Sequence, residues 1–243
     1  MKKTKTIIIT GSEGMIGRSL REYFSKKNFN IIGIDKKKGI NSIYCDITDE
    51  KSLKKKLSVM LKKKSPDILI NAASIVPRIK KFKFSNYSSK NWMNSIKVDL
   101  FGSFFISKIC CKYFERKKKG LIINLSSIYG DSGPDQSIYG KLKRNYGYKN
   151  LEYSVAKAGI IGFTKALSSF YKNSNIKVLC FILGGVQGSK VSKNFKKYYL
   201  KKTVENKMIT TDQICKYIEF CISNPDTVSG SCINLDGGAR SIF

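Results

Sequence analysis

The chain has 243 residues, which is enough for one α/β domain with a sizeable core, and we expect one domain over 1–243. Lys and Arg number 46 against 17 Asp and Glu, giving a formal net charge of +29, but the lysines lie in short separate runs, which favours a solvated surface over a nucleic-acid partner. The seven cysteines include no CxxC pair and histidine is absent, so we predict no metal site and reduced thiols in a cytoplasmic protein. The sequence has no long apolar run and no signal-peptide core, so we also predict no membrane partner.

The first predicted element is a buried strand that ends in a glycine turn. The β-branched run Ile7 to Ile9 precedes Gly11, Gly14 and Gly17, and helical spacing follows over 15–27. This order would bring a pyrophosphate to the unpaired N–H groups of a helix N-terminus. Gly11 would permit the tight turn, Gly14 the close approach of the backbone, and Gly17 the packing of the helix on the strand. Glycine turns also serve connections that bind nothing, so this motif alone is a weak signal.

A second predicted strand, over 30–34, ends at Asp35. An acidic side chain there would accept both hydroxyls of an adenosine ribose and repel a 2′-phosphate, which predicts NAD in preference to NADP. The three lysines at 36–38 follow at once and weaken that preference. A short third strand over 42–45 leads to Asp46, which would either bond the adenine amino group or cap a helix over 48–64.

Two more predicted strands end in small or polar residues. The run 67–71 leads into Ala72 and Ala73, whose small side chains leave room for a dinucleotide at the carboxyl edge of the sheet. A long helix follows over 88–115, and a strand over 120–125 then brings Ser126 and Ser127 to the same edge.

The next stretch, 131–150, is rich in glycine, tyrosine and polar residues. A loop of this length beside a sheet edge predicts the wall of a substrate pocket, with a solvated insertion as the alternative. In the helix that follows, over 152–171, Tyr153 and Lys157 are four residues apart and therefore share a face.

The rest of the chain completes the alternation of strands and helices. A strand over 177–182 precedes a polar, lysine-rich segment over 189–211, which we expect to be a lid. Thr211 and Asp212 would cap the last helix, and a strand over 231–235 closes the sheet. The pattern predicts a doubly wound parallel sheet of about seven strands with helices on both faces.

Four motifs follow one another along the chain: Thr10-Gly-Ser-Glu-Gly-Met-Ile-Gly17, Asn71-Ala-Ala-Ser74, Ser126-Ser127 and Tyr153-Ser-Val-Ala-Lys157. In order and spacing they resemble the classical short-chain dehydrogenases/reductases, and the resemblance covers essentially the whole chain. It implies a Rossmann-type fold and an NAD(P)-dependent enzyme that forms homodimers or homotetramers. With the residues argued above, the expected cofactor-binding set is Gly11, Ser12, Gly14, Met15, Ile16, Gly17, Asp35, Asp46, Ile47, Asn71, Ala72, Ala73, Tyr153, Lys157, Gly184 and Val186.

The resemblance also implies catalytic roles, which a physical argument supports. Hydride transfer between a nicotinamide and a carbinol carbon requires a proton to leave or join the oxygen. A free tyrosine, with a pKa of about 10, is poorly matched to that task at neutral pH. A lysine one turn away would favour the phenolate, and its ammonium would also bond the nicotinamide ribose. Tyr153 is then the expected general acid/base, with Lys157 beside it and Ser127 holding the substrate oxygen.

The sequence departs from the family pattern at three positions. Asp99 stands in the long helix where the family usually has an asparagine that is thought to hold a water of a proton relay. Its charge would be unhelpful beside a phenolate unless it is protonated or paired with a lysine. Leu183 replaces a proline, and Gly188 replaces a threonine that often contacts the carboxamide. These changes bear on turnover more than on cofactor binding.

A narrower resemblance rests on Ser127-Ile-Tyr-Gly130, on the loop with Pro134-Asp135, and on Glu152-Tyr153-Ser154. These are similar to oxidoreductases of legionaminic acid and related sugar pathways for flagellin or surface polysaccharides. The substrate implied is a phosphorylated or nucleotide-linked sugar, whose phosphate would meet three basic loop residues, Lys141, Lys143 and Arg144. The alternatives are a 3-oxoacyl-thioester reductase and a nucleotide-binding scaffold or redox sensor without turnover. The reductase would normally prefer NADPH, which the acidic side chain of Asp35 disfavours.

Overall fold

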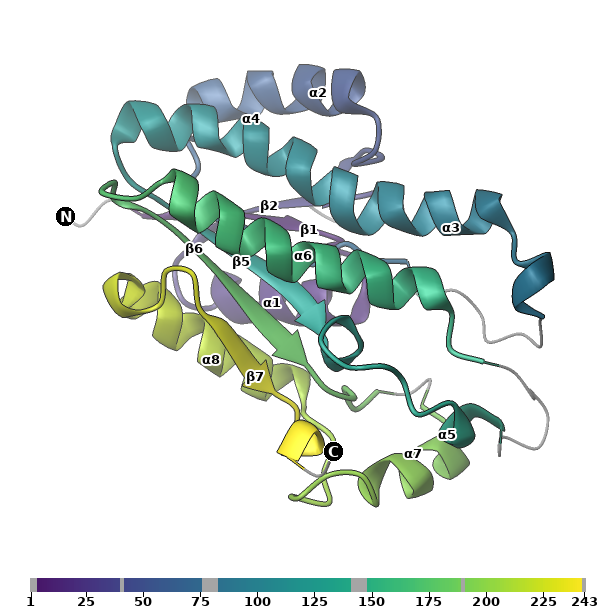
Figure 1. Ribbon diagram of the computed structural model, residues 1–243. Coiled ribbons are helices and arrows are strands. Elements are labelled where there is room, and N and C mark those ends of the chain that lie inside the picture. Colours follow the sequence, from purple (N-terminus) through teal and green to yellow (C-terminus); the bar gives the residue numbers. More distant parts are fainter. Residues whose placement is uncertain (1–3, 40–41, 76–82, 141–147, 189–190, 242–243) are drawn as a thin grey trace.

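The structure is a computed structural model that describes residues 4–39, 42–75, 83–140, 148–188 and 191–241. Its centre is a sheet with the strand order β3-β2-β1-β4-β5-β6-β7, in which every pair is parallel (Figure 1). The strands are β1 (Thr6–Thr10), β2 (Asn30–Asp35), β3 (Ser42–Tyr44), β4 (Ile68–Asn71), β5 (Gly120–Ser127), β6 (Ile176–Leu183) and β7 (Cys232–Leu235). The predicted doubly wound sheet is therefore confirmed.

Helices cover both faces of the sheet. They are α1 (Met15–Ser25), α2 (Glu50–Lys63), α3 (Ser89–Ile96), α4 (Gly102–Lys117), α5 (Gln136–Gly140), α6 (Leu151–Phe170), α7 (Lys193–Leu200) and α8 (Thr211–Ser223). One face packs its buried side chains against α1 and α8, and the other packs against α2, α4 and α6 (Figure 1). Alternate residues of β1 divide between the two cores, since Ile7 and Ile9 join the first and Ile8 the second.

The order of the strands determines where a ligand can bind. β1 pairs with β2 on one side and with β4 on the other, so the connections after β1 and β4 leave the sheet in opposite directions. Open α/β sheets bind ligands at such a reversal, outside the carboxyl ends of the strands. Thr10 and Asn71 are paired at this point.

Two local features differ from the sequence predictions. The long helix expected over 88–115 contains a π-helical turn, Lys97–Phe101, between α3 and α4. The last helix is capped by Thr210, whose side chain accepts the Gln213 N–H while Gln213 bonds back to Thr210, so the prediction of a cap at Thr211 and Asp212 was wrong. A capping box needs Gln or Glu three residues after the cap, and only Thr210 has one there.

The cysteines are all free, and six of the seven are buried, with Cys232 half-buried. Among the residues that the structure describes, no helix combines the length and the apolar character needed to cross a membrane.

Candidate active site

The glycine turn after β1 has the geometry expected for anion binding. Gly11 has a φ of +66°, and its carbonyl accepts the Gly14 N–H at 2.9 Å. A Cβ at Gly17 would lie 2.1 Å from the Gly11 oxygen, so only glycine lets the helix approach the turn. Helix α1 begins after Gly14 without a side-chain cap, which leaves its first N–H groups available to a ligand.

A groove of about 320 Å³ opens beside this turn, at the carboxyl ends of β1, β2 and β4. Seven of the expected cofactor-binding residues line it: Gly11, Gly14, Asp35, Asp46, Ile47, Ala72 and Ala73. The structure adds Ile34, Lys36, Lys37, Cys45, Ser74, Ile75 and Val98 to the lining. A glycine cradle, an uncapped helix and a walled groove together fit the dinucleotide that the sequence predicts.

Asp35 is held rigidly in this groove. Its two carboxylate oxygens accept the backbone N–H groups of Glu13, at 2.9 Å, and Lys37, at 2.8 Å. The carboxylate is therefore fixed in position, and Asp35 lines the groove together with Lys36 and Lys37. Asp46 accepts the backbone N–H and the hydroxyl of Thr48, whereas Asp49 caps α2, so the alternative role of Asp46 as the helix cap was wrong.

The structure does not bring every predicted side chain to the groove. The Asn71 side chain donates to Ser107 of α4 at 3.2 Å and to Asn124 of β5 at 2.8 Å, so it links β4 to both elements instead of facing the groove. The Ser12 hydroxyl is buried against Gly33 of β2, where a Cβ would stand 2.7 Å from it. Ser12 is 0% exposed and does not line the groove, so the structure does not present its side chain to a ligand there.

The other expected cofactor residues lie around the glycine turn and at the end of β6. Met15 is half exposed, and its sulfur lies 2.4 Å from the place of a Gly188 Cβ, so the missing side chain at Gly188 makes room for it. Ile16 packs partly against the core. Gly184 lies so close to Asp236 and Tyr199 that a Cβ would stand 2.7 Å from each, while Val186 bridges Ile209.

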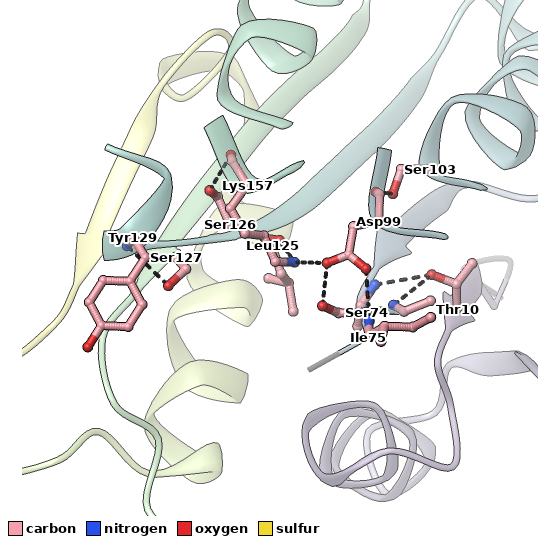
Figure 2. A network of polar contacts seen from close by, with 12 residues as sticks. Thr10, Ser74, Ile75, Asp99, Ser103, Leu125, Ser126, Ser127, Tyr129 and Lys157 are labelled. Carbon is pink, nitrogen blue, oxygen red and sulfur yellow. Dashed lines mark hydrogen bonds and ion pairs between the residues drawn. The ribbon is translucent and has the colours of Figure 1, made fainter. Parts of the chain in front are cut away.

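Asp99 is the centre of a buried polar network (Figure 2). One of its carboxylate oxygens accepts the Ile75 N–H at 2.8 Å, and the other accepts the Ser74 hydroxyl at 2.5 Å. The second oxygen also lies 3.4 Å from the Lys157 ammonium, and the two side chains are 0% and 6% exposed. The π-helical turn places Asp99 here. The carboxylate of Asp99 is thus paired with a lysine, which is one of the two conditions under which its charge is compatible with a nearby phenolate.

Lys157 is fixed from two sides. Its ammonium donates to the Leu125 carbonyl at 3.0 Å and pairs with Asp99 (Figure 2). Burial by itself lowers the pKa of Lys157, but attraction to Asp99 and Tyr153 outweighs burial, so the pKa lies above its ordinary value. Lys157 therefore carries a fixed positive charge at neutral pH.

Tyr153 lies beside this charge, as its place on α6 predicts. The Lys157 ammonium is 5.7 Å from the centre of the Tyr153 ring. Ser127, the last residue of β5, accepts the Tyr129 N–H through its hydroxyl at 3.3 Å (Figure 2). The Tyr129 and Tyr153 rings both face the ammonium of Lys149, at 5.9 and 3.9 Å from their centres. The residues expected to be catalytic are thus gathered at the carboxyl end of β5.

The N-terminus of α6 is fixed by a buried acid. Glu152 accepts hydrogen bonds from the Tyr87 hydroxyl and from the Asn150 amide, and Tyr87 also accepts the Leu151 N–H. Burial and the bond to Glu152 raise the pKa of Tyr87 to about 12. These contacts hold the first turn of α6, which carries Tyr153, against the segment that leads into α3.

Sequence reasoning missed Lys149. It is 8% exposed, although it belongs to the polar stretch predicted as a substrate loop. Burial, followed by repulsion from Lys157, lowers its pKa to about 8. The only sequence signal is its position four residues before Tyr153, which repeats the spacing from Tyr153 to Lys157. In so lysine-rich a chain, that spacing does not stand out.

The described parts of the predicted substrate loop and of the predicted lid pack on each other. Tyr139 of α5 bonds the Tyr129 hydroxyl at 2.9 Å and contacts Phe195 of α7. Tyr199 of α7 accepts the Gly185 N–H at 2.5 Å. These aromatic rings lie next to the end of β5. The predicted phosphate contacts Lys141, Lys143 and Arg144 lie outside the described residues.

Comparison with known proteins agrees with this geometry. The family model for the short chain dehydrogenases matches residues 5–199. A short chain dehydrogenase from Leptospira borgpetersenii, solved with bound NAD+, is 30% identical, with a TM-score of 0.88 over 98% of this chain and 93% of that one.

Two curated relatives are similarly distant. A 3-oxoacyl-(acyl-carrier-protein) reductase of Buchnera aphidicola subsp. Schizaphis graminum is 29% identical over 96% of each chain. The post-translational flagellin modification protein A of Campylobacter coli is 29% identical over 98% of this chain and 99% of its own length.

The chain therefore belongs to the short-chain dehydrogenase/reductase family. It is an oxidoreductase that acts on an alcohol or ketone with a nicotinamide cofactor. The family acts on small molecules, and its members are typically oligomers.

Proposed function

We propose that this protein is an NAD-dependent oxidoreductase for a secondary alcohol or ketone of a phosphorylated or nucleotide-linked sugar. The observation that carries the proposal is the Tyr153 ring, 5.7 Å from the buried ammonium of Lys157, at the sheet edge that also forms the glycine-turn groove. A phenol beside a fixed cation is suited to proton exchange with a carbinol oxygen.

Each residue has a separate task in this proposal. Tyr153 takes the proton from the alcohol, or returns it to the ketone oxygen, at its phenol oxygen. Ser127 hydrogen-bonds the same substrate oxygen and holds it within reach. Lys157 keeps a positive charge beside the Tyr153 ring, while Asp99 keeps the ammonium in place. The nicotinamide, when bound, supplies or accepts the hydride.

The preference for NAD rests on Asp35. The carboxylate is held in the groove by two backbone N–H groups, in position to accept ribose hydroxyls and to repel a 2′-phosphate. Lys36 and Lys37 line the same groove and reduce that repulsion. The solved Leptospira relative binds NAD+, which agrees with this preference.

The sugar substrate is supported by the relative from Campylobacter coli, a protein of flagellin modification, and by the loop motifs that resemble sugar-pathway oxidoreductases. The second candidate is a 3-oxoacyl-thioester reductase, which the Buchnera relative favours. The two functions differ in both cofactor and substrate.

A coupled screen distinguishes the candidates. The protein is assayed with sugar phosphates and nucleotide sugars against NAD reduction, and with a 3-oxoacyl thioester against NADH and NADPH oxidation. We expect turnover of a sugar with NAD. Turnover of the thioester with NADPH alone would overturn both the proposed sugar substrate and the proposed preference for NAD that rests on Asp35.

We also propose that the protein is a homodimer or homotetramer built through its long helices. Exposed apolar side chains on α3, on the π-helical turn after it, on α4 and on α6 support this: Met93, Phe101, Phe104 and Val155 are all 43% or more exposed. Phe104 also contacts Phe163 of α6, which joins these side chains across the two helices. Sedimentation that gives only a monomer at micromolar concentration would contradict the proposal.

A further inference from the structure

The Lys149 ammonium is a buried cation without an anion. It contacts the faces of the Tyr153 and Tyr129 rings, and it makes no hydrogen bond or ion pair with any residue that the structure describes. A buried ammonium is costly unless a negative group or several acceptors replace its lost water. The rings provide only part of that replacement.

The neighbouring acids are already committed to other partners. Asp99 is held by Lys157, Ser74 and Ile75, and Glu152 is held by Tyr87 and Asn150. Both attract Lys149 from a distance, whereas Lys157 repels it. The net effect of burial and these charges is a pKa of about 8, so the ammonium titrates close to neutral pH.

Lys149 is also fixed by its backbone. Its N–H donates to the Gln136 side chain at 2.7 Å, and its carbonyl accepts from the same amide at 3.2 Å. Gln136 is the first residue of α5, so α5 holds Lys149 in place next to Tyr153. A surface lysine that happens to fold inward would have no such reciprocal pair.

We propose that Lys149 binds an oxyanion of the substrate, a carboxylate or a phosphate, on a carbon close to the one that reacts at Tyr153. The ammonium lies 3.9 Å from the ring centre, so a substrate held at the phenol oxygen has its neighbouring substituents within reach of Lys149. The interaction is charge-assisted and shielded from water, which makes it stronger than a contact with a surface lysine.

This inference rests on the proposed function in that Tyr153 marks the reacting carbon, and it narrows the substrate class. A hydroxy acid, or a sugar with a carboxylate or phosphate near the reacting hydroxyl, satisfies Lys149. A neutral sugar alcohol leaves the ammonium unpaired. A nucleotide-linked sugar whose only charge is on its distant diphosphate also leaves the Lys149 ammonium unpaired.

The test measures anion binding at Lys149 directly. Lysine side chains are labelled with ¹³C at Cε in the NAD-loaded protein, and the Lys149 signal is assigned by its loss in Lys149→Met. Inorganic phosphate and acetate are then added separately between pH 6 and 10. Phosphate and acetate represent the two sources of the anion, and acetamide is the neutral control for acetate.

We expect phosphate or acetate, but not acetamide, to shift this signal and to raise the pKa at which it titrates, because a bound anion favours the charged form. Lys149→Met should weaken binding by about tenfold or more. Lys149→Arg should keep it and extend it above pH 8, since arginine stays charged. Lys172→Met should leave binding unchanged, because Lys172 is an exposed residue between α6 and β6, at the amino end of β6 and away from Tyr153.

An unshifted Lys149 signal, or equal binding by wild type and Lys149→Met, would overturn the inference. NAD binding is measured in the same samples, so a general failure of the cofactor site is recognised separately. If NAD and the anion bind but no sugar is turned over, the proposed function fails and the anion site remains.

Discussion

The Lys157 ammonium lies 3.4 Å from a carboxylate oxygen of Asp99, and both side chains are buried. The family pattern that the sequence resembles usually has an asparagine, which is neutral, at the position of Asp99. The carboxylate is compensated by the lysine and by two further hydrogen bonds, from Ser74 and Ile75. The pair thus keeps the lysine charged in spite of burial.

Asp99→Asn should destabilise the fold by about 3 kcal/mol, because it leaves a buried ammonium without its counter-ion. The raised pKa of Lys157 contributes stability that is present below its ordinary value of 10.5 and is lost as pH rises above it. In the variant, burial is no longer offset by Asp99 and lowers the pKa of Lys157, so the stability of Asp99→Asn should instead rise as pH approaches 10.5 and the buried ammonium loses its proton. Urea unfolding between pH 6 and 10 measures both effects.

Asp212→Asn is the matched control for that measurement. Asp212 pairs with Lys216 on the surface, with side chains 59% and 65% exposed, so we expect a change within about 0.5 kcal/mol. Equal unfolding free energies for wild type and Asp99→Asn would show that the buried pair contributes nothing.

Tyr153→Phe should reduce turnover on the order of 10²-fold or more and leave NAD binding unchanged, because it removes only the hydroxyl that we propose to exchange a proton. Steady-state kinetics on the substrate found by the screen, with calorimetric titration of NAD, separates the two effects. Tyr217→Phe, on the exposed side of α8, serves as the control. Full activity of Tyr153→Phe would remove this residue from the reaction.

Lys149→Met should stabilise the ligand-free protein at pH 7 by about 1 to 3 kcal/mol, since the pKa of Lys149 is lowered from 10.5 to about 8. The unfolded chain binds more protons between these two values, so the stability of the wild type rises from pH 8 to 10.5 and the advantage of the variant shrinks there. Thermal unfolding at pH 7 and pH 10 measures the difference. A destabilised variant at pH 7 would mean that the ammonium is adequately paired.

Asp35→Asn should shift cofactor preference toward NADP on the order of tenfold or more, because it removes the charge that repels a 2′-phosphate and leaves Lys36 and Lys37 in the groove. The ratio of the dissociation constants for NAD and NADP is the quantity to measure. Glu22→Gln, on the outer side of α1, controls for the change in net charge. An unchanged ratio would show that Asp35 does not set the preference.

Gly17→Ala should destabilise the protein by about 1 to 3 kcal/mol, since the new Cβ would lie 2.1 Å from the Gly11 oxygen. Gly162→Ala in α6 is the contrasting variant, because nothing lies within 4 Å of its Cβ position. We expect Gly162→Ala to stabilise the protein by roughly 0.5 to 1 kcal/mol. Comparable destabilisation by the two variants would contradict a specific need for glycine at the turn.

The fold was predictable because the strands are short, apolar, β-branched runs that are buried on both faces, and they alternate with helical spacing. The two serines at the end of β5 were not predicted as strand because polar residues rarely continue such a run, yet Ser127 pairs with Leu183 of β6. The π-helical turn leaves no mark in the pattern of apolar residues. Its backbone spacing depends on contacts with other elements.

The site was predictable where a motif carries its own geometry. The glycine turn, Asp35 and the pair Tyr153 and Lys157 lie at the predicted carboxyl edge of the sheet. Asn71 was expected at the groove, but neighbouring polar residues on β5 and α4 draw its side chain inward. Lys149 could not be distinguished from other lysines, because burial by a distant segment is a tertiary property.

The π-helical turn has a consequence for insertions and deletions in this chain. A helix advances by about 100° per residue, so removal of a single residue between Lys97 and Phe101 would restore ordinary helical winding and rotate the preceding segment by that angle. Asp99 would then swing away from Ser74, and Lys157 would be left uncompensated, although no residue in contact with a substrate had been altered. Deletion of one residue from the π-helical turn should therefore abolish activity more completely than most replacements of individual side chains.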